Sequence, residues 1–212
     1  LVPAKTALLI IDMQRDFLEP GGFGEMLGND VSQLRRAIEP NKTLLAAWRA
    51  AGLQVLHTRE GHRADLSDLT ECKRLRAANA GAAIGTQGPL GRLLVRGEYG
   101  HDLIDELQPL TGEPVVDKPG YSAFASTDLD LLLRNRGITA LVISGVTTEV
   151  CVSSTLRDAI ERGYACTLVS DACASPYPEL HAAALAMVGV EGGVFGRVCD
   201  SRHLLTEWRA PA

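Results

Sequence analysis

The sequence predicts an α/β protein of three layers, in which helices cover both faces of a mostly parallel central sheet. Short apolar runs rich in β-branched residues alternate along the chain with segments of helical periodicity, which is the pattern of βαβ units joined by right-handed crossovers. A length of 212 residues and a hydrophobic fraction of 46% are enough for a sizeable core. We therefore expect one domain that spans residues 1–212.

Six strands and six helices are expected along the chain. The expected strands comprise residues 7–11, 53–57, 114–117, 140–144, 165–170 and 192–198, the last as a short edge strand. The expected helices comprise 31–51, with Pro40 as an interruption, 99–107, 127–136, a helix that begins after 147 and ends near 163, 180–188 and 201–209. Residues 58–80 are charged and expected to be irregular, and the glycine-rich residues 81–100 are expected to form a long excursion.

Composition and charge argue against several classes of function. The formal net charge is -5 and no basic block is present, which argues against a nucleic-acid partner. No apolar run is long enough to span a membrane, and no signal peptide is expected, because the first residues lead directly into a strand. The five cysteines are scattered and odd in number, which is typical of reduced thiols in a cytoplasmic protein.

The chemistry of the chain is expected to centre on Cys151. It follows the apolar strand at 140–144, the break at Gly145 and the helix-capping residues Thr147 and Thr148, so it falls in the first turn of a helix. Free N–H groups and the helix dipole favour an anion there, which predicts a lowered pKa for the Cys151 thiol and an oxyanion site at the same N–H groups. The alternative is a small apolar residue packed under the helix.

Two charged residues follow other expected strands. Asp12 comes directly after 7–11, where partial burial would raise its pKa and suit it to proton transfer, and a role in capping the next turn is the alternative. Lys118 comes directly after 114–117, and the alternative there is an exposed surface lysine. Because the carboxyl ends of parallel strands share one edge of the sheet, we expect Asp12, Lys118 and Cys151 to meet as base, electrostatic stabiliser and nucleophile.

Loops near these strand ends supply candidate substrate-binding residues. They are Gln14 and Phe17 after the first strand, Arg59 after the second, and Tyr121 and Phe124 after Lys118. No metal site is expected, because the polar residues between 57 and 68 show no compact arrangement of His and Asp ligands. The glycines at 81–100 do not follow a strand in the Gly-x-Gly-x-x-Gly manner, so a dinucleotide site is not indicated.

Three motifs together resemble the isochorismatase-like cysteine hydrolase superfamily, over essentially the whole chain. They are ALLIIDMQRDF at 7–17, DKPGYSAF at 117–124 and SGVTTEVCV at 144–152. The resemblance implies an isochorismatase-like, Rossmann-like fold, the catalytic triad Asp12, Lys118 and Cys151, and no cofactor. It also implies a cis peptide bond between Val146 and Thr147, which directs the N–H of Thr147, beside that of Cys151, toward an oxyanion. A homo-oligomer, dimer or tetramer, is implied as well.

The same resemblance implies hydrolysis of a linear amide C–N bond through a covalent thioester-type acyl-enzyme, with release of ammonia or a small amine. Residues 57–62 lack the Asp-x-His motif of metal-bound nicotinamidases, whereas 57–68 and 192–196 are similar to the biuret hydrolase and ureidoacrylate amidohydrolase branch. Relatives there often carry Gln where this chain has Glu191, and a carboxylate that contacts the substrate would favour a neutral molecule rich in N–H donors. We therefore expect a ureide of nitrogen metabolism as substrate, biuret or triuret.

Three alternatives stay open at this point. The first is hydrolysis of ureidoacrylate or another N-carbamoyl compound. The second is isochorismatase-type cleavage of a vinyl ether, which does not need the thiol. The third is a non-catalytic binding protein that uses the same fold, since fold alone does not determine function.

Overall fold

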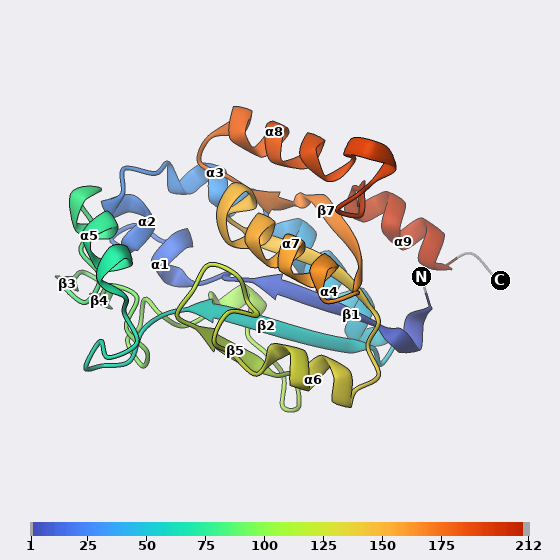
Figure 1. Ribbon diagram of the computed structural model, residues 1–212, viewed down its shortest axis with the longest axis horizontal. Coiled ribbons are helices and arrows are strands. Elements are labelled where there is room, and N and C mark those ends of the chain that lie inside the picture. The colour runs from blue at the N-terminus through green and yellow to red at the C-terminus, as the bar shows by residue number, and fades with distance from the viewer. Residues whose placement is uncertain (1, 210–212) are drawn as a thin grey trace.

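The computed structural model describes residues 2–209 and contains a six-stranded sheet in which all paired strands are parallel (Figure 1). In spatial order the strands are β5 (Val115–Lys118), β2 (Gln54–Glu60), β1 (Thr6–Ile11), β6 (Ala140–Val146), β7 (Ala165–Ala174) and β8 (Arg197–Cys199). A separate antiparallel pair, β3 (Gln87–Gly88) and β4 (Gly91–Arg92), lies outside this sheet. The predicted α/β class is confirmed.

Helices cover both faces of the sheet and form the two outer layers (Figure 1). One face carries α3 (Val31–Arg35), α4 (Ile38–Ala50) and α9 (Ser201–Arg209), and the other carries α6 (Leu129–Asn135), α7 (Ser153–Glu161) and α8 (Pro178–Val188). In β1, Leu8 and Ile10 belong to the core beneath α4, whereas Leu9 and Ile11 belong to the core beneath α6 and α7. Because side chains alternate between two apolar layers, every residue of β1 is buried.

Several short elements gather at one end of the molecule. In Figure 1, α1 (Arg15–Leu18), α2 (Phe23–Met26), α5 (Glu71–Asn79) and the β3–β4 pair lie beyond the carboxyl ends of β1 and β2. The remaining short elements are η1 (Pro3–Lys5), η2 (Asp105–Leu107), the π-helical turn η3 (Thr148–Val152) and η4 (Val190–Gly192). Within residues 2–209, no helix has the length and apolar character needed to cross a membrane.

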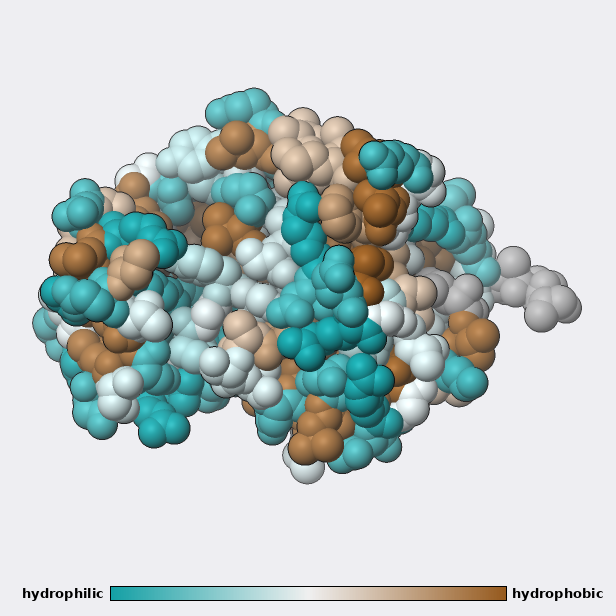
Figure 2. All heavy atoms as spheres, viewed as in Figure 1, coloured by the Kyte–Doolittle hydropathy of each residue, from teal (hydrophilic) through white to brown (hydrophobic). Residues whose placement is uncertain are grey.

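The outer helices differ in surface character. Figure 2 shows hydrophilic residues in a band that runs from top to bottom through the centre of the face that it views, with hydrophobic residues around its upper end, where Figure 1 places α8. Leu180 and Met187 are the exposed large hydrophobic residues within α8. The apolar side chains of α8 are therefore only partly covered by the sheet.

Several predicted boundaries differ in the structure. The predicted helix at 31–51 divides after Arg35 rather than at Pro40, because Pro40 lies in the first turn of α4, where a missing N–H leaves no helical bond unmade. The prediction of irregular structure at 58–80 is wrong at both ends, since β2 continues to Glu60 and α5 begins after its cap Thr70. β7 likewise continues to Ala174, and only the single turn η2 forms within the helix predicted at 99–107.

Candidate active site

Three strand ends bring Asp12, Lys118 and Cys151 together. Asp12 directly follows β1 with a φ of 48°, Lys118 is the last residue of β5, and Cys151 lies in η3, between β6 and α7. The Lys118 ammonium lies 2.7 Å from Asp12 Oδ2 and 3.4 Å from Cys151 Sγ. All three side chains are buried. The structure thus places the three predicted catalytic residues in one cluster.

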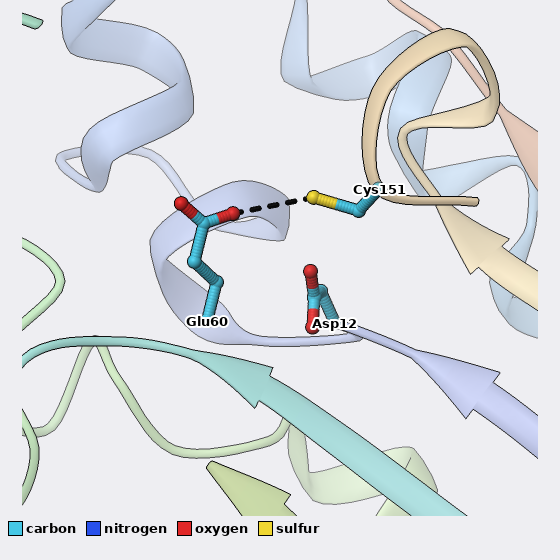
Figure 3. A group of neighbouring side chains, drawn as sticks. All are labelled: Asp12, Glu60 and Cys151. Atoms are coloured by element: carbon cyan, nitrogen blue, oxygen red, sulfur yellow. Dashed lines mark hydrogen bonds between the residues drawn. The ribbon is translucent and has the colours of Figure 1, made fainter. Parts of the chain in front are cut away.

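A fourth member of this cluster, Glu60, has no counterpart in the sequence-based prediction. Its Oε2 accepts a hydrogen bond from the Cys151 thiol at 3.2 Å (Figure 3), and its Oε1 lies 2.6 Å from Lys73 Nζ. Lys118 Nζ lies 3.6 Å from Oε2. Glu60 escapes prediction because β2 ends in polar residues, so the apolar pattern stops at 57, three residues too early. Lys73 also escapes prediction, because it lies in the segment 58–80 that the sequence analysis expects to be irregular. The sequence signals that mark α5 are the cap Thr70 and the closing Gly81.

Hydrogen bonds between neighbouring strand ends position the two carboxylates. Thr58 Oγ1 donates to Asp12 Oδ1 at 2.6 Å, and the Asp12 N–H donates to the Thr58 carbonyl at 3.2 Å. The Gln14 side chain accepts from the Glu60 N–H at 2.6 Å and donates to the Glu60 carbonyl at 2.9 Å. Gln14 is buried, and its amide binds backbone rather than lining a cavity. In the structure, the predicted substrate-binding residue Gln14 therefore lies outside the cavity lining and holds the backbone of Glu60.

A glycine allows β6 to approach β1 closely before the chain reaches Cys151. Gly145 has a φ of 114°, in the region that L side chains rarely adopt, and a Cβ there would collide with the backbone of Ile11. The next peptide bond, between Val146 and Thr147, is cis. Beyond this bond, Thr147 and Cys151 line the same cavity.

Burial and charge act differently on the two carboxylates. Burial raises the pKa of Asp12, while Lys118 opposes this shift and Glu60 adds to it. Burial also disfavours the charge of Glu60, but Lys118 and Lys73 together hold the pKa of Glu60 below its ordinary value. Burial disfavours the charge of Lys118 as well, yet Asp12, Cys151 and Glu60 hold its pKa above the ordinary value. Asp12 is therefore the carboxylate that more readily takes up a proton, and Glu60 is the one that stays ionised.

The Cys151 thiol does not have the predicted lowered pKa. Burial raises the pKa of Cys151 well above its usual value, and although Lys118 opposes this shift, Glu60 and Asp12 add to it. Cys151 also lies in the π-helical turn before α7 rather than in the first turn of that helix. The prediction is wrong because it considered the helix alone and neither the burial of the thiol nor the carboxylates of Glu60 and Asp12. Burial and the neighbouring carboxylates therefore favour the protonated form of the Cys151 thiol.

A cavity of about 430 Å³ lies over this cluster. Its apolar wall comes from the short elements α1, α2 and α5 and the segment after them, with Phe17, Phe23, Leu27, Ala77, Ala80 and Ile84. Polar side chains on the lining include Arg76, Tyr121, Thr147 and Glu149. This volume suits a small molecule held between an apolar wall and a few polar groups.

The other predicted substrate-binding residues separate into two groups. Phe17 and Tyr121 line the cavity. Arg59 does not, because its guanidinium pairs with Asp117 at 2.8 Å and Asp102 at 2.9 Å. Phe124 is buried in the core, where its ring stacks on Tyr164 with centroids 5.9 Å apart. Glu191 is exposed in η4, beyond α8, and is not among the residues of the cavity lining. Arg59, Phe124 and Glu191 thus lie outside this cavity lining, because nearness to a motif along the chain does not decide which way a side chain points.

The cluster contains potential metal ligands, but an ammonium ion already lies among them. Asp12, Glu60 and Cys151 offer ligand atoms within 4.8 Å of one another. Lys118 Nζ lies 2.7 Å from Asp12 Oδ2, 3.6 Å from Glu60 Oε2 and 3.4 Å from Cys151 Sγ. Since the Lys118 and Lys73 ammonium groups already pair with the two buried carboxylates, the arrangement fits acid–base and nucleophilic chemistry better than metal binding.

Comparison with known proteins agrees with this geometry. The isochorismatase domain model matches residues 6–202. The ureidoacrylate amidohydrolase RutB of Acinetobacter baylyi is 35% identical over 213 residues, which cover 99% of this chain and 86% of that protein. The ureidoacrylate amidohydrolase RutB of Pantoea ananatis is 37% identical over 210 residues, which cover 95% of this chain and 81% of that protein.

Solved structures show the same relationship. An isochorismatase family protein from Desulfovibrio vulgaris matches with a TM-score of 0.79 and 30% identity, covering 97% of this chain and 99% of that one. A cysteine hydrolase from Pseudomonas syringae pv. phaseolicola matches with a TM-score of 0.82 and 28% identity, covering 97% of this chain and 93% of that one. The chain described here therefore belongs to the isochorismatase family and is an isochorismatase-like hydrolase.

Proposed function

We propose that this chain is a cysteine-dependent amidohydrolase that cleaves a C–N bond of a small ureido compound. The observation that carries the proposal is the contact of Cys151 Sγ with the Lys118 ammonium at 3.4 Å, where Lys118 is itself 2.7 Å from Asp12 and Cys151 lines the cavity. A thiol, a carboxylate with a raised pKa and a fixed cation are the groups that nucleophilic attack on an amide carbonyl requires.

In the first step of the proposed reaction, Asp12 takes the thiol proton of Cys151 while Lys118 offsets the charge of the thiolate. The sulfur forms a bond to the carbonyl carbon of the ureido group, and the N–H groups of Thr147 and Cys151 bind the resulting oxyanion. The C–N bond then breaks as Asp12 returns the proton to the leaving nitrogen. This step yields an S-carbamoyl enzyme and a free amine.

In the second step, Asp12 takes a proton from water, and the hydroxide oxygen attacks the carbonyl carbon of the S-carbamoyl group. The S–C bond breaks, and the Cys151 sulfur recovers a proton from Asp12. Carbamic acid leaves and decomposes to carbon dioxide and ammonia. In each step Asp12 accepts one proton and returns it, so Asp12 and Cys151 end in their starting states. The enzymatic reaction converts one ureido compound and one water into one amine and one carbamic acid.

The cavity supports an anionic ureido acid, such as ureidoacrylate, as the substrate. Arg76 lines the cavity, and within residues 2–209 its guanidinium forms no ion pair, its polar contacts being Cys72 Sγ at 3.0 Å and Tyr121 Oη at 3.5 Å. A free guanidinium at a cavity favours a carboxylate. The expectation of biuret or triuret depended on Glu191, which lies elsewhere.

A second candidate substrate, biuret or triuret, is supported by a different residue. Glu149 lines the same cavity, and its buried Oε2 has no hydrogen-bond partner in the described part of the chain. An unpaired buried carboxylate oxygen favours a ligand with N–H donors, and biuret and triuret carry more of these donors than ureidoacrylate does.

A substrate panel tests the proposal. The purified protein is incubated separately with ureidoacrylate, biuret, triuret and isochorismate, and released ammonia and pyruvate are measured. We expect ammonia from a ureido compound, with ureidoacrylate the preferred substrate. Pyruvate from isochorismate without ammonia from any ureido compound would instead establish vinyl ether hydrolysis.

A further inference from the structure

Glu60 has a position that the proposed mechanism does not explain. It is buried at the end of β2, and its Oε2 accepts the Cys151 S–H at 3.2 Å (Figure 3). An ionised carboxylate beside a nucleophilic sulfur opposes thiolate formation, because two negative charges repel at short range. Such a placement calls for another role of the carboxylate during the reaction.

The surroundings of Glu60 hold its Oε1 atom and direct its Oε2 atom toward the Cys151 sulfur. Oε1 is held by Lys73, whose ammonium lies 2.6 Å away and also donates to the Pro119 carbonyl at 2.6 Å. Gln14 holds the backbone N–H and carbonyl of Glu60 at 2.6 Å and 2.9 Å. The carboxylate is thus fixed in position and direction, and Oε2 has only the thiol as a close donor once Lys118, at 3.6 Å, is engaged with Asp12.

Proton transfer removes that donor. When the thiol proton moves to Asp12, Oε2 keeps its charge and loses its hydrogen bond, which is costly for a buried carboxylate. The carbonyl carbon that bonds to sulfur brings its own substituents to within hydrogen-bond reach of Oε2. A ureido group carries an amino group on that carbon, whereas a simple ester or acetyl group carries no donor there.

On this basis, and resting on the proposed amidohydrolase function, we propose that Glu60 is a specificity-determining catalytic residue: its Oε2 accepts a hydrogen bond from the amino group that stays on the attacked carbonyl carbon, and so selects carbamoyl compounds. Asp12 carries the proton from the thiol to the leaving nitrogen, and Glu60 remains ionised throughout. The bonds that form and break are those of the proposed reaction, so Glu60 neither gains nor loses a proton.

Two chromogenic esters isolate this contact. p-Nitrophenyl carbamate and p-nitrophenyl acetate share a leaving group that needs no protonation, and they differ only in carrying an amino or a methyl group on the carbonyl carbon. In Glu60→Gln we expect kcat/KM for the carbamate to fall roughly 10- to 100-fold, the range expected for a hydrogen bond to a charged group. For the acetate we expect no fall, or a rise, because removing the Glu60 charge favours the thiolate.

Control variants and outcomes keep the test decisive. Glu71→Gln removes an exposed carboxylate of α5 that pairs with Arg74 at 2.6 Å and does not line the cavity, and it is expected to leave both rates unchanged. Glu60→Asp is the second variant, in case Glu60→Gln fails to fold. It keeps the negative charge but moves the carboxylate oxygen away from the Cys151 sulfur, so the ratio of kcat/KM for the carbamate to kcat/KM for the acetate is expected to fall there too. Equal losses on both esters, or an unchanged carbamate rate, would overturn the inference for Glu60. Turnover of either ester that persists in Cys151→Ala would instead overturn the proposed mechanism.

Discussion

The Lys118 ammonium and the Asp12 carboxylate form an ion pair of 2.7 Å in which both side chains are completely buried. Neither charge is solvated, so each depends on the other and on the remaining members of the cluster. The pair joins the ends of β1 and β5, two strands that are not neighbours in the sheet. The site and the sheet are therefore energetically coupled at this point.

That coupling can be measured with a double-mutant cycle. We expect Lys118→Met to lower the free energy of unfolding by about 3–5 kcal/mol, because it leaves a buried carboxylate without its cation. In the Asp12→Asn background the same change is expected to cost less, with a coupling energy of about 1 kcal/mol or more. Urea denaturation of the four proteins gives these values, and strictly additive losses would show that the pair is not coupled.

Removal of the nucleophile separates the thiol mechanism from its alternatives. We expect Cys151→Ser to lower the rate of ammonia release from the preferred ureido compound at least about a thousandfold, with an unchanged circular dichroism spectrum. Cys199→Ser, in the edge strand β8, removes another thiol outside the cavity lining and is expected to keep full activity. Ammonia release that survives in Cys151→Ser would contradict nucleophilic catalysis.

Arg76 is expected to discriminate between charged and neutral ureido compounds. We expect Arg76→Gln to raise KM for ureidoacrylate roughly tenfold, because a charge-assisted hydrogen bond to the substrate carboxylate is lost. KM for biuret is expected to stay the same. Arg74→Gln is the matched control, since Arg74 lies on the same helix, is exposed and pairs with Glu71 rather than lining the cavity. An equal rise of KM for both compounds would show that Arg76 shapes the cavity without distinguishing an anionic substrate from a neutral one.

Asp16 is expected to make stability depend on pH. It is buried, accepts the N–H groups of Phe23 and Leu94 at 3.3 Å and 3.0 Å, and has a pKa raised by burial from 3.8 to about 6. A carboxyl whose pKa is higher in the folded protein binds protons more tightly there, so its contribution to stability declines as pH rises through about 6. The free energy of unfolding of the unmodified protein relative to Asp16→Asn is therefore expected to fall by about 3 kcal/mol from pH 3.5 to pH 7.

Exposed Asp65 supplies a control of opposite sign for this measurement. Hydrogen bonds from Ser67 hold the pKa of Asp65 below its ordinary value, so its small contribution is present at neutral pH and lost on acidification. The difference between the unmodified protein and Asp65→Asn is expected to rise slightly with pH. A difference for Asp16→Asn that also rises with pH would show that the Asp16 carboxylate is stabilising rather than costly.

Gly145 is expected to tolerate no side chain. Gly145→Ala is predicted to lower the free energy of unfolding by about 3 kcal/mol or more, since the added Cβ meets the backbone of Ile11 and the φ of 114° is unfavourable for alanine. Gly137→Ala is the control, with a φ of 66° and open space around the added atom, and is expected to cost about 1 kcal/mol. Similar losses in thermal or urea unfolding would rule out the collision with β1 as the cause.

Local patterns were sufficient to identify the layers and three members of the candidate site. The apolar run of β1 is buried on both faces, so its composition alone indicates a central strand, and the polar residue after it is found where parallel sheets place their sites. Lys118 at the end of β5 and Cys151 beyond the end of β6 lie at the same edge of the sheet. Side chains that lie at the end of an apolar strand have few directions open to them, which makes their convergence predictable.

Only the tertiary structure determined which polar residues share the cavity and how their charges act. Glu60 and Lys73 belong to the cluster although neither follows an apolar run, while Glu191 and Arg59 lie outside it although they stand near recognisable motifs. The upward shift of the Cys151 pKa likewise depends on the burial of the thiol, and next on the carboxylates of Glu60 and Asp12, which are distant along the chain. Burial and electrostatic interactions are set by distances between segments far apart in sequence, and these distances exist only once the sheet has formed.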